Sequence, residues 1–524
     1  MKRYTLLILF FVGICAVSCK KDFLNRPDIN NPTLDTYYTN AAQVNGATGL
    51  LYGYAWFPFM DRAYLSIGDI MGGTGITQGP GDYAPYMNFT VSQTDAQVLN
   101  AWKAFYKVAG SATILMNAFE AKKASASNPA YLNQGIAEAH FIRAVAYFYL
   151  ARIFRDVPIV TDPVALASSS DIRVPRYIQS DVLKFVIQEL KAAESGLGET
   201  AYQPGRVTTY SAKGMMAKVY LYMGDYENAK AKAQEVINSG KYDLFSDYYQ
   251  MFSTDKSNNN IESLFALQWI VGGDYQAANH LQTNIGPAPL LAPINAGGYS
   301  SVVPSITLLQ SFEPGDKRRQ VIMEQGWTRS DWTNVNFPNG FKYDTLTTGS
   351  ATDQALKIKN ATRTNSAKYV TGTGSNGDNV IGSSTDMNTY ILRYADVLLI
   401  YAEAVLGNNS STSDPSALAA FNKVRARAGL PALNTLTKDI ILKERMIEFN
   451  FEGDYWFDVQ RQGFEKAKQI LWSQERGTYD YNGKLQHVDV KLQFTNASQL
   501  YLPIPASEIT VNDLLAQPAV PYYK

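Results

Sequence analysis

The feature that most constrains the fold is a pair of apolar stripes at helical spacing, separated by a glycine. The first stripe covers 215–223, the second covers 226–237, and Gly224-Asp225 lies between them. Apolar residues at intervals of three and four predict amphipathic helices, and a glycine at the break is typical of a helix end. Neither helix can bury its apolar face alone, so other helices must cover both.

Further helical stripes recur along the chain. One covers 136–153, a pair covers 394–406 and 415–428, and another covers 440–451. The helix–glycine–helix unit at 215–240 resembles one tetratricopeptide repeat. These stripes predict a mainly α fold, in which tetratricopeptide-like helical pairs stack into an α-α superhelix rather than forming separate domains.

The segment from 272 to 388 has a different composition. Gly, Pro, Ser, Thr and Asn dominate it, with Trp and Tyr scattered among them. Loops of this length inside a compact chain are usually either functional or disordered, and the aromatic residues favour function. We therefore expect this loop-rich insertion to be functional.

The N-terminal residues predict export and lipidation. Met1-Lys2-Arg3 precedes an apolar run from Leu6 to Val17, and Ala16-Val17-Ser18-Cys19 resembles the bacterial lipobox, whose cysteine is acylated. We predict a lipoprotein signal peptide at 1–18 and a mature chain at 19–524 that is lipidated at Cys19. An ordinary signal peptide with a chance cysteine is the alternative. Later segments lack the apolar length of a membrane span, so the sequence predicts anchoring without crossing.

Composition argues against several classes of function. Lys plus Arg and Asp plus Glu both number 47, so the formal net charge is zero and bulk attraction to nucleic acid is not expected. His140, His280 and His487 lie far apart without metal-ligand spacing. Gly372 to Gly377 matches the dinucleotide-binding fingerprint, but no helix pattern follows it. We therefore predict no metal and no cofactor.

A cluster of acidic residues near the C-terminus could be mistaken for glycosidase carboxylates. Its members are Glu444, Glu448, Glu452, Asp454 and Asp458. Glycosidases need two carboxyl groups on opposite sides of a sugar, whereas acids four residues apart share one helix face. Because Arg445 and Arg461 are nearby in the sequence, we expect a structural ion-pair network and no enzyme activity.

Several motifs occur in a characteristic order. They are Cys19-Lys20-Lys21-Asp22-Phe23-Leu24, Phe154-Arg155-Asp156-Val157-Pro158, Arg393-Tyr394-Ala395-Asp396-Val397-Leu398-Leu399, Asp454-Tyr455-Trp456-Phe457-Asp458 and Leu502-Pro503-Ile504-Pro505. In this order they resemble the SusD/RagB family of Bacteroidetes outer-membrane nutrient-binding lipoproteins. Two positions depart from the family pattern: Arg155 stands where glycine is usual, and Tyr455 where arginine is common.

The resemblance implies a non-catalytic function and a SusD-like fold, in which the loop-rich insertion at about 272–388 forms the ligand face. Such a protein lies at the outer membrane, facing the cell exterior, and delivers an oligosaccharide or polysaccharide to a SusC-like TonB-dependent transporter. The resemblance also implies that Trp456 and Asp396 are scaffold residues. Two alternatives stay open, namely a binder of peptides or another nutrient on the same scaffold, and a helical-repeat assembly scaffold without a small ligand.

Aromatic residues in the loops are the candidate ligand-binding residues. A sugar presents an apolar C–H face and a rim of hydroxyls, so it needs flat rings flanked by polar groups. Two loop regions provide them, and the predicted contacts are Tyr83, Tyr86, Tyr275, Tyr299, Trp327 and Trp332. We expect at least two of the six to touch ligand. The alternative is that the rings fill gaps beneath the loops, as we expect for Trp269, which follows an apolar run.

Overall fold

The computed structural model describes most of the chain. The described residues are 37–77, 81–287, 290, 298–345, 360–480, 483–489 and 493–523. The predicted signal peptide and Cys19 lie outside them.

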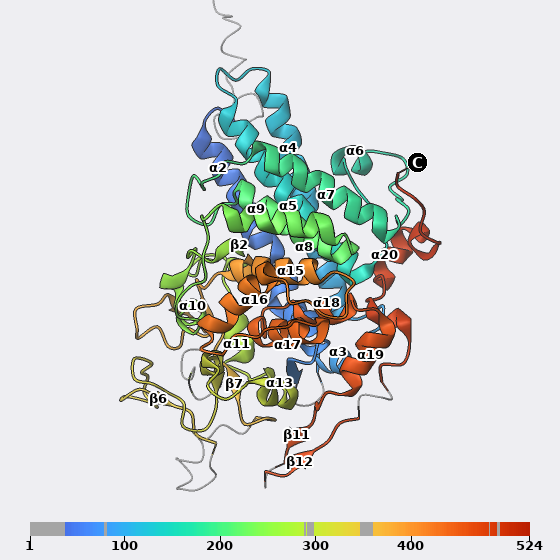
Figure 1. The fold of residues 1–524 in the computed structure, drawn as a ribbon. Helices are drawn as coiled ribbons and strands as arrows, with labels where there is room; N and C mark the ends of the chain where they lie inside the picture. The colour runs from blue at the N-terminus through green and yellow to red at the C-terminus, as the bar shows by residue number, and fades with distance from the viewer. Residues whose placement is uncertain are drawn as a thin grey trace, which may run out of the picture.

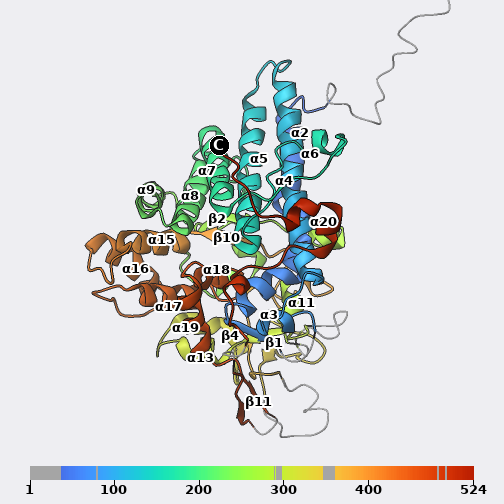
Figure 2. The same ribbon diagram turned by 90° about the vertical axis from the view of Figure 1, so that its right-hand side faces the viewer.

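Stacked helices form one part of the molecule and loops with short strands form the other (Figures 1 and 2). The principal helices are α4 (Ala96–Lys123), α5 (Ala130–Phe154), α7 (Gln179–Gly196), α8 (Thr209–Met223), α9 (Tyr226–Asn238), α15 (Tyr394–Leu406), α16 (Pro415–Arg427) and α17 (Lys438–Glu448). Each packs on a neighbour: α4 on α5, α5 on α7, α7 on α8, α8 on α9, α9 on α15, and α15 on α16 and α17. The predicted fold class, mainly α with stacked helical pairs, is confirmed.

Local sequence explains where the α8–α9 pair begins and ends. Thr208 and Ser211 form a capping box at the start of α8, which satisfies backbone N–H groups that have no partner within the helix. Gly224 ends α8 with φ +72°, a left-handed conformation that glycine adopts without steric cost. The Asp225 side chain then accepts a hydrogen bond from the backbone N–H of Asn228 and caps α9.

Shorter elements surround this scaffold. The helices are α2 (Ala41–Gly49), α3 (Ala84–Met87), α6 (Pro163–Ala167), α10 (Gln250–Ser253), α11 (Leu281–Ile285), α13 (Ile306–Ser311), α18 (Tyr455–Gln460), α19 (Phe464–Trp472) and α20 (Ala506–Val511). Antiparallel two-stranded pairs are β1 (Gly75–Thr77) with β3 (Val302–Pro304), β2 (Ser263–Leu267) with β10 (Thr389–Arg393), β4 (Ile322–Met323) with β7 (Asn365–Ser366), β5 (Thr328–Arg329) with β6 (Phe341–Lys342), β8 (Val380–Ile381) with β9 (Ser384–Thr385), and β11 (Thr478–Tyr479) with β12 (Leu485–Gln486). The loop-rich insertion therefore leaves the scaffold after β2 and returns to it through β10.

The acidic cluster on α17 and the residues after it is a buried ion-pair network. Glu448 pairs with Arg318, Arg393 and Arg427, and Asp454 pairs with Lys218 at 2.7 Å. Burial alone would raise the pKa of Glu448, but the positive charges of Arg427, Arg393 and Arg318 outweigh it and hold the pKa well below its usual range. The prediction of a structural network is confirmed, and Asp396 and Trp456 are buried within the scaffold.

This network predicts a loss of stability in acid. The unfolded chain protonates Glu448 near its usual pKa of about 4.3, whereas the folded state does so only at lower pH. Lowering the pH from about 5 to about 3 should therefore lower the melting temperature, as measured by calorimetry. Glu448→Gln should reduce this pH dependence, and Glu324→Gln, at a surface pair with Arg319, should leave it intact. Stability that rises on acidification over this range would contradict the prediction.

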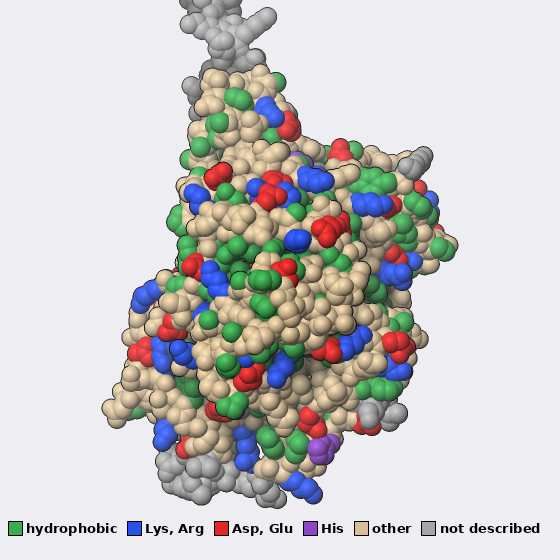
Figure 3. Space-filling model, viewed as in Figure 1, with side chains coloured by type: hydrophobic (Ala, Val, Ile, Leu, Met, Phe, Trp, Pro, Cys, Tyr) green, Lys and Arg blue, Asp and Glu red, His purple; other side chains and the backbone are tan. Residues whose placement is uncertain are grey.

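Charged side chains of both signs are interspersed over the face shown in Figure 3. This distribution agrees with a sequence of zero formal net charge.

Candidate functional site

A pocket of about 520 Å³ brings together segments that are far apart in the sequence. We call it the Tyr275–Tyr299 pocket. Its lining residues are Asp61, Arg62, Asp82, Tyr83, Tyr275, His280, Thr283, Asn284, Tyr299, Ser301 and Gly382. Three of the six predicted ligand-binding residues are thus in one place.

Tyr275 and Tyr299 present large open rings at this pocket. Tyr275 is 67% exposed and Tyr299 is 59% exposed. The backbone beneath each ring is fixed: Asp274 caps the short helix Tyr275–Ala277, and the backbone N–H of Tyr299 donates to the Thr283 carbonyl at 2.9 Å. Exposed aromatic rings on a fixed backbone are suited to stacking against a flat apolar surface.

His280 supports the Tyr275 ring from behind. The ring centroids of the two residues are 4.1 Å apart, and Phe57 packs edge-on against both rings. His280 Nε2 lies 2.9 Å from the Tyr275 carbonyl. Because a carbonyl oxygen only accepts, Nε2 must carry the proton and donate it. Nδ1 lies 3.2 Å from the Ser384 hydroxyl. Burial lowers the pKa of His280, which favours the neutral ring that these two contacts suit.

Charged and amide groups form the polar part of the pocket. The Arg62 guanidinium contacts the carboxylate of Asp82 and lies 3.7 Å from that of Asp61. Burial raises the pKa of Asp61, and the neighbouring Arg62 opposes this rise. The Asn284 amide donates to the Asp61 carbonyl at 2.7 Å and accepts from the Tyr83 hydroxyl at 3.1 Å. The pocket therefore has both hydrogen-bond donors and acceptors beside the two exposed rings.

The other predicted residues have different surroundings. Tyr83 lines the pocket but is only 7% exposed, so it shapes the wall rather than offering an open face. Tyr86 is fully buried, and its hydroxyl donates to Asp95, which caps α4. Trp332 is also fully buried, and Trp327 is half-buried between Tyr249 and Trp332.

The expectation of an open loop ring is therefore wrong for Tyr86 and Trp332, because the core covers both. Ligand contact stays a prediction for Tyr83, Tyr275, Tyr299 and Trp327. Trp269 is buried, as expected, and its indole N–H donates to the Thr389 hydroxyl at 3.0 Å.

The glycine motif at 372–377 has a structural role. Gly372, Gly374 and Gly377 all have positive φ values, between +79° and +87°. A Cβ atom on Gly372 would lie 2.6 Å from the Trp332 indole, so the close approach of the backbone to this ring requires glycine. The next regular element is strand β8, which confirms that no helix follows the motif.

Sequence reasoning missed Asp61, Arg62 and His280 as site residues. Asp61 and Arg62 lie in a π-helical turn, Phe59–Ala63, within a stretch of short irregular turns. Such turns occur frequently at functional sites, but they leave no periodic pattern in the sequence. In the sequence, His280 has no neighbour that indicates a role, because its packing against Tyr275 depends on the tertiary fold.

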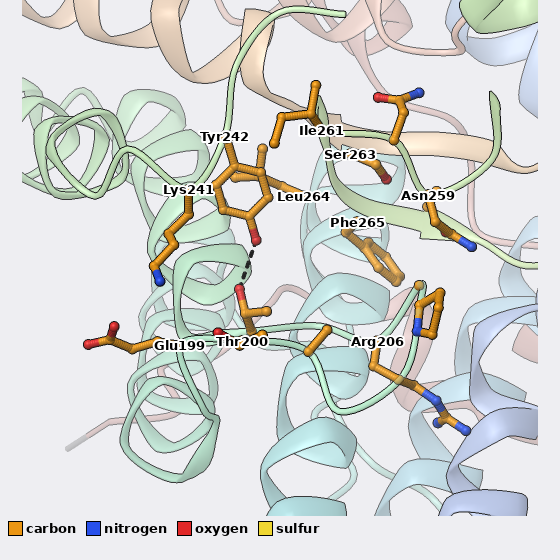
Figure 4. A pocket seen from close by; sticks show the side chains of 16 residues that line it. Glu199, Thr200, Arg206, Lys241, Tyr242, Asn259, Ile261, Ser263, Leu264 and Phe265 are labelled. Carbon is orange, nitrogen blue, oxygen red and sulfur yellow. Dashed lines mark hydrogen bonds between the residues drawn. The ribbon is translucent and has the colours of Figure 1, made fainter.

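A second pocket lies beside the helical scaffold and is shown in Figure 4. It has a volume of about 350 Å³ and lies between the loop 199–206 and strand β2. The Tyr242 hydroxyl lies 2.9 Å from the Thr208 hydroxyl, and the Arg206 guanidinium bonds to Thr48 and Glu138. These polar groups already have partners, and no ring as exposed as Tyr275 lines this pocket among the described residues. The Tyr275–Tyr299 pocket is the better candidate site.

Comparison with known proteins identifies the family. The SusD family model matches residues 261–523, and a model described as "Starch-binding associating with outer membrane" matches residues 81–221. A SusD-like protein of Bacteroides ovatus is 32% identical over 99% of this chain and 98% of its own length. The chain belongs to the SusD family. Proteins of this family bind carbohydrate and are non-catalytic.

Solved structures of SusD-like proteins agree with this assignment. One, determined with a xylogluco-oligosaccharide, is 31% identical, has a TM-score of 0.79, and matches over 92% of this chain and 99% of its own. A laminarin-binding SusD-like protein is 22% identical with a TM-score of 0.70, over 91% of this chain and 98% of its own, and shows the shared fold. Within the described residues of this SusD-family chain, no helix has the length and apolar character needed to span a membrane.

Proposed function

We propose that this SusD-family protein binds an oligosaccharide or polysaccharide in the Tyr275–Tyr299 pocket. The observation that carries the proposal is the pair of open tyrosine rings beside a fixed rim of carboxylate, guanidinium and amide groups. A solved relative, 31% identical, holds a xylogluco-oligosaccharide, which supports the class of ligand.

The chemistry of the pocket fits a neutral glycan. The C–H face of a sugar ring stacks on Tyr275 or Tyr299, and its hydroxyls exchange hydrogen bonds with Asp61, Asp82 and Arg62. Arg62 is already held by the two carboxylates, so the described lining of the pocket offers no unpaired positive charge to an anionic ligand. Neutral hydroxyls can both donate to the carboxylates and accept from the guanidinium.

The proposal extends to anchoring and delivery. Lipidation at Cys19 would hold the protein on the outer membrane, facing the cell exterior, where it would deliver the glycan to a SusC-like TonB-dependent transporter. Membership of the SusD family and the lipobox-like sequence before Cys19 support this part.

Removing either exposed ring should weaken binding without unfolding the protein. Tyr275→Ala and Tyr299→Ala should each lower affinity by about 30-fold, the effect of a binding hot spot, because a stacking surface is lost. Their melting temperatures should stay close to that of the wild type, since both rings are largely exposed. Binding is first detected by affinity gel electrophoresis with starch, xyloglucan and laminarin, and is then measured by titration calorimetry.

Tyr54→Ala is the matched control. Tyr54 is also an exposed tyrosine, at 38%, but it does not line the pocket. Unchanged affinity in both pocket variants would contradict the proposed site. Binding of a peptide library with no retardation by any polysaccharide would instead favour the peptide-binding alternative.

A further inference from the structure

A further pocket, of about 710 Å³, lies beside the segment 372–386. We call it the Arg329 pocket. Arg329 and Asp331 contribute one wall of this pocket. The segment around α10 contributes Tyr249, Gln250 and Lys256, and the segment 372–386 contributes Asn376. Trp327 packs against Tyr249 and Trp332 lies beneath Arg329, so these two predicted residues lie beside this pocket and are not in the lining of the Tyr275–Tyr299 pocket.

Arg329 is held rigidly in this wall. Its guanidinium donates two hydrogen bonds to Asp331, at 2.6 and 2.5 Å, and one to the Tyr249 hydroxyl at 2.5 Å. The guanidinium also lies 4.8 Å from the centre of the Trp332 ring. Among the described residues, three of the five N–H donors of Arg329 have hydrogen-bond partners, which leaves two that can bond to a ligand. The buried Trp332 thus supports a polar group at the pocket wall instead of offering its own face.

The pocket also has balanced charge. Its lining contains two carboxylates, Asp247 and Asp331, and two cations, Lys256 and Arg329. Lys256 donates to the Asn376 carbonyl at 3.0 Å. Two carboxylates and two cations give no net attraction for an anion or a cation. With the hydroxyls of Ser253, Thr254 and Ser257 and the amides of Gln250 and Asn376 added, the lining suits a neutral ligand that is rich in hydroxyl groups.

One chain segment borders both pockets. Asn376 lines the Arg329 pocket, and Gly382 lines the Tyr275–Tyr299 pocket. Six residues span at most about 20 Å, so these two borders lie within reach of one extended polymer. Hydrogen bonds from Thr333 to Ser375 at 2.8 Å and from Ser375 to the Asp331 carbonyl at 2.6 Å fix this segment against the Arg329 wall.

We propose that the Arg329 pocket is a second carbohydrate subsite, which binds a distant part of the same polysaccharide chain that occupies the Tyr275–Tyr299 pocket. This inference rests on the proposed function. Two linked contacts raise affinity for a ligand long enough to reach both, because the second contact forms at high effective concentration. A short oligosaccharide fills only the Tyr275–Tyr299 pocket and gains nothing from the second.

The test compares polymers with short oligosaccharides by titration calorimetry. The probes are starch, xyloglucan and laminarin, each with short oligosaccharides prepared from it. Arg329→Met and Gln250→Ala should each lower affinity for the bound polymer by about tenfold and leave affinity for its oligosaccharide unchanged. Arg319→Met is the matched control, because Arg319 forms a similar two-bond pair with Glu324 but does not line the pocket.

Gln250 is exposed at the start of α10, so its truncation keeps the test valid if Arg329→Met does not fold. Polymer affinity that is unchanged in Gln250→Ala and in folded Arg329→Met, but reduced in Tyr275→Ala, would overturn the second subsite alone. An equal loss for polymer and oligosaccharide would also overturn it. If none of the polymers binds to the wild-type protein, the proposed function itself fails, and the subsite with it.

Discussion

Replacing Arg393 by methionine is expected to destabilise the protein by about 3–5 kcal/mol, the usual cost of removing one partner from a buried ionic cluster. Arg393 is 1% exposed. Its guanidinium makes five hydrogen bonds, which go to the carboxylates of Glu262, Glu448 and Glu452 and to the Glu448 carbonyl. These bonds match the five N–H donors of an arginine.

The cost arises because the three glutamates stay buried after the arginine is lost. Methionine fills much of the arginine stem's volume but supplies no charge, so burial would then penalise the carboxylates. The change is measured as the free energy of unfolding in denaturant. Arg319→Met, at a surface pair with Glu324, should stay within about 1 kcal/mol of the wild type. An Arg393→Met variant as stable as this control would show that the network contributes little to stability.

Replacing Cys19 by alanine should move the protein from the membrane fraction to the soluble fraction. The lipobox-like run ends at this cysteine, and acyl chains contribute about 0.8 kcal/mol per buried CH₂, so several chains give stable anchoring. Fractionation of cells followed by immunoblotting measures the distribution. Ser18→Thr, next to the acceptor position, should retain the protein on the membrane. Full membrane retention of Cys19→Ala would contradict the predicted anchor.

The helices could be predicted from the sequence because their causes are local. The α8–α9 pair is specified by apolar spacing, by the capping residue Thr208 and by the left-handed Gly224, all within about 30 residues of one another. The existence of an ion-pair network could also be predicted, because several acids and arginines occur close together around Glu448. The arginines that pair with Glu448 could not be predicted, since Arg318 and Arg393 come from distant segments.

The candidate site could be predicted only in part. Aromatic residues in irregular segments carry no signal that separates an open ring from a covered one. Tyr86 lies in the hydrophobic core with its hydroxyl bonded to Asp95, and the Gly372 backbone packs on Trp332, whereas Tyr275 projects beside His280 and stays open. These differences depend on tertiary contacts, which composition and spacing do not report.

The pairing of β2 with β10 has a consequence for how such proteins diversify. Leu267 lies opposite Thr389, so the chain leaves and re-enters the scaffold at adjacent positions of one small sheet. A segment whose ends are fixed together can change length at a small entropic cost, because closure entropy grows only slowly with loop size. Insertions, deletions and exchanges between these two strands would therefore change one part of the proposed ligand face while the helical stack stays constant. The part of the lining that comes from 61–83 and 245–257 would be kept, so such changes would modify an existing pocket and would not replace it.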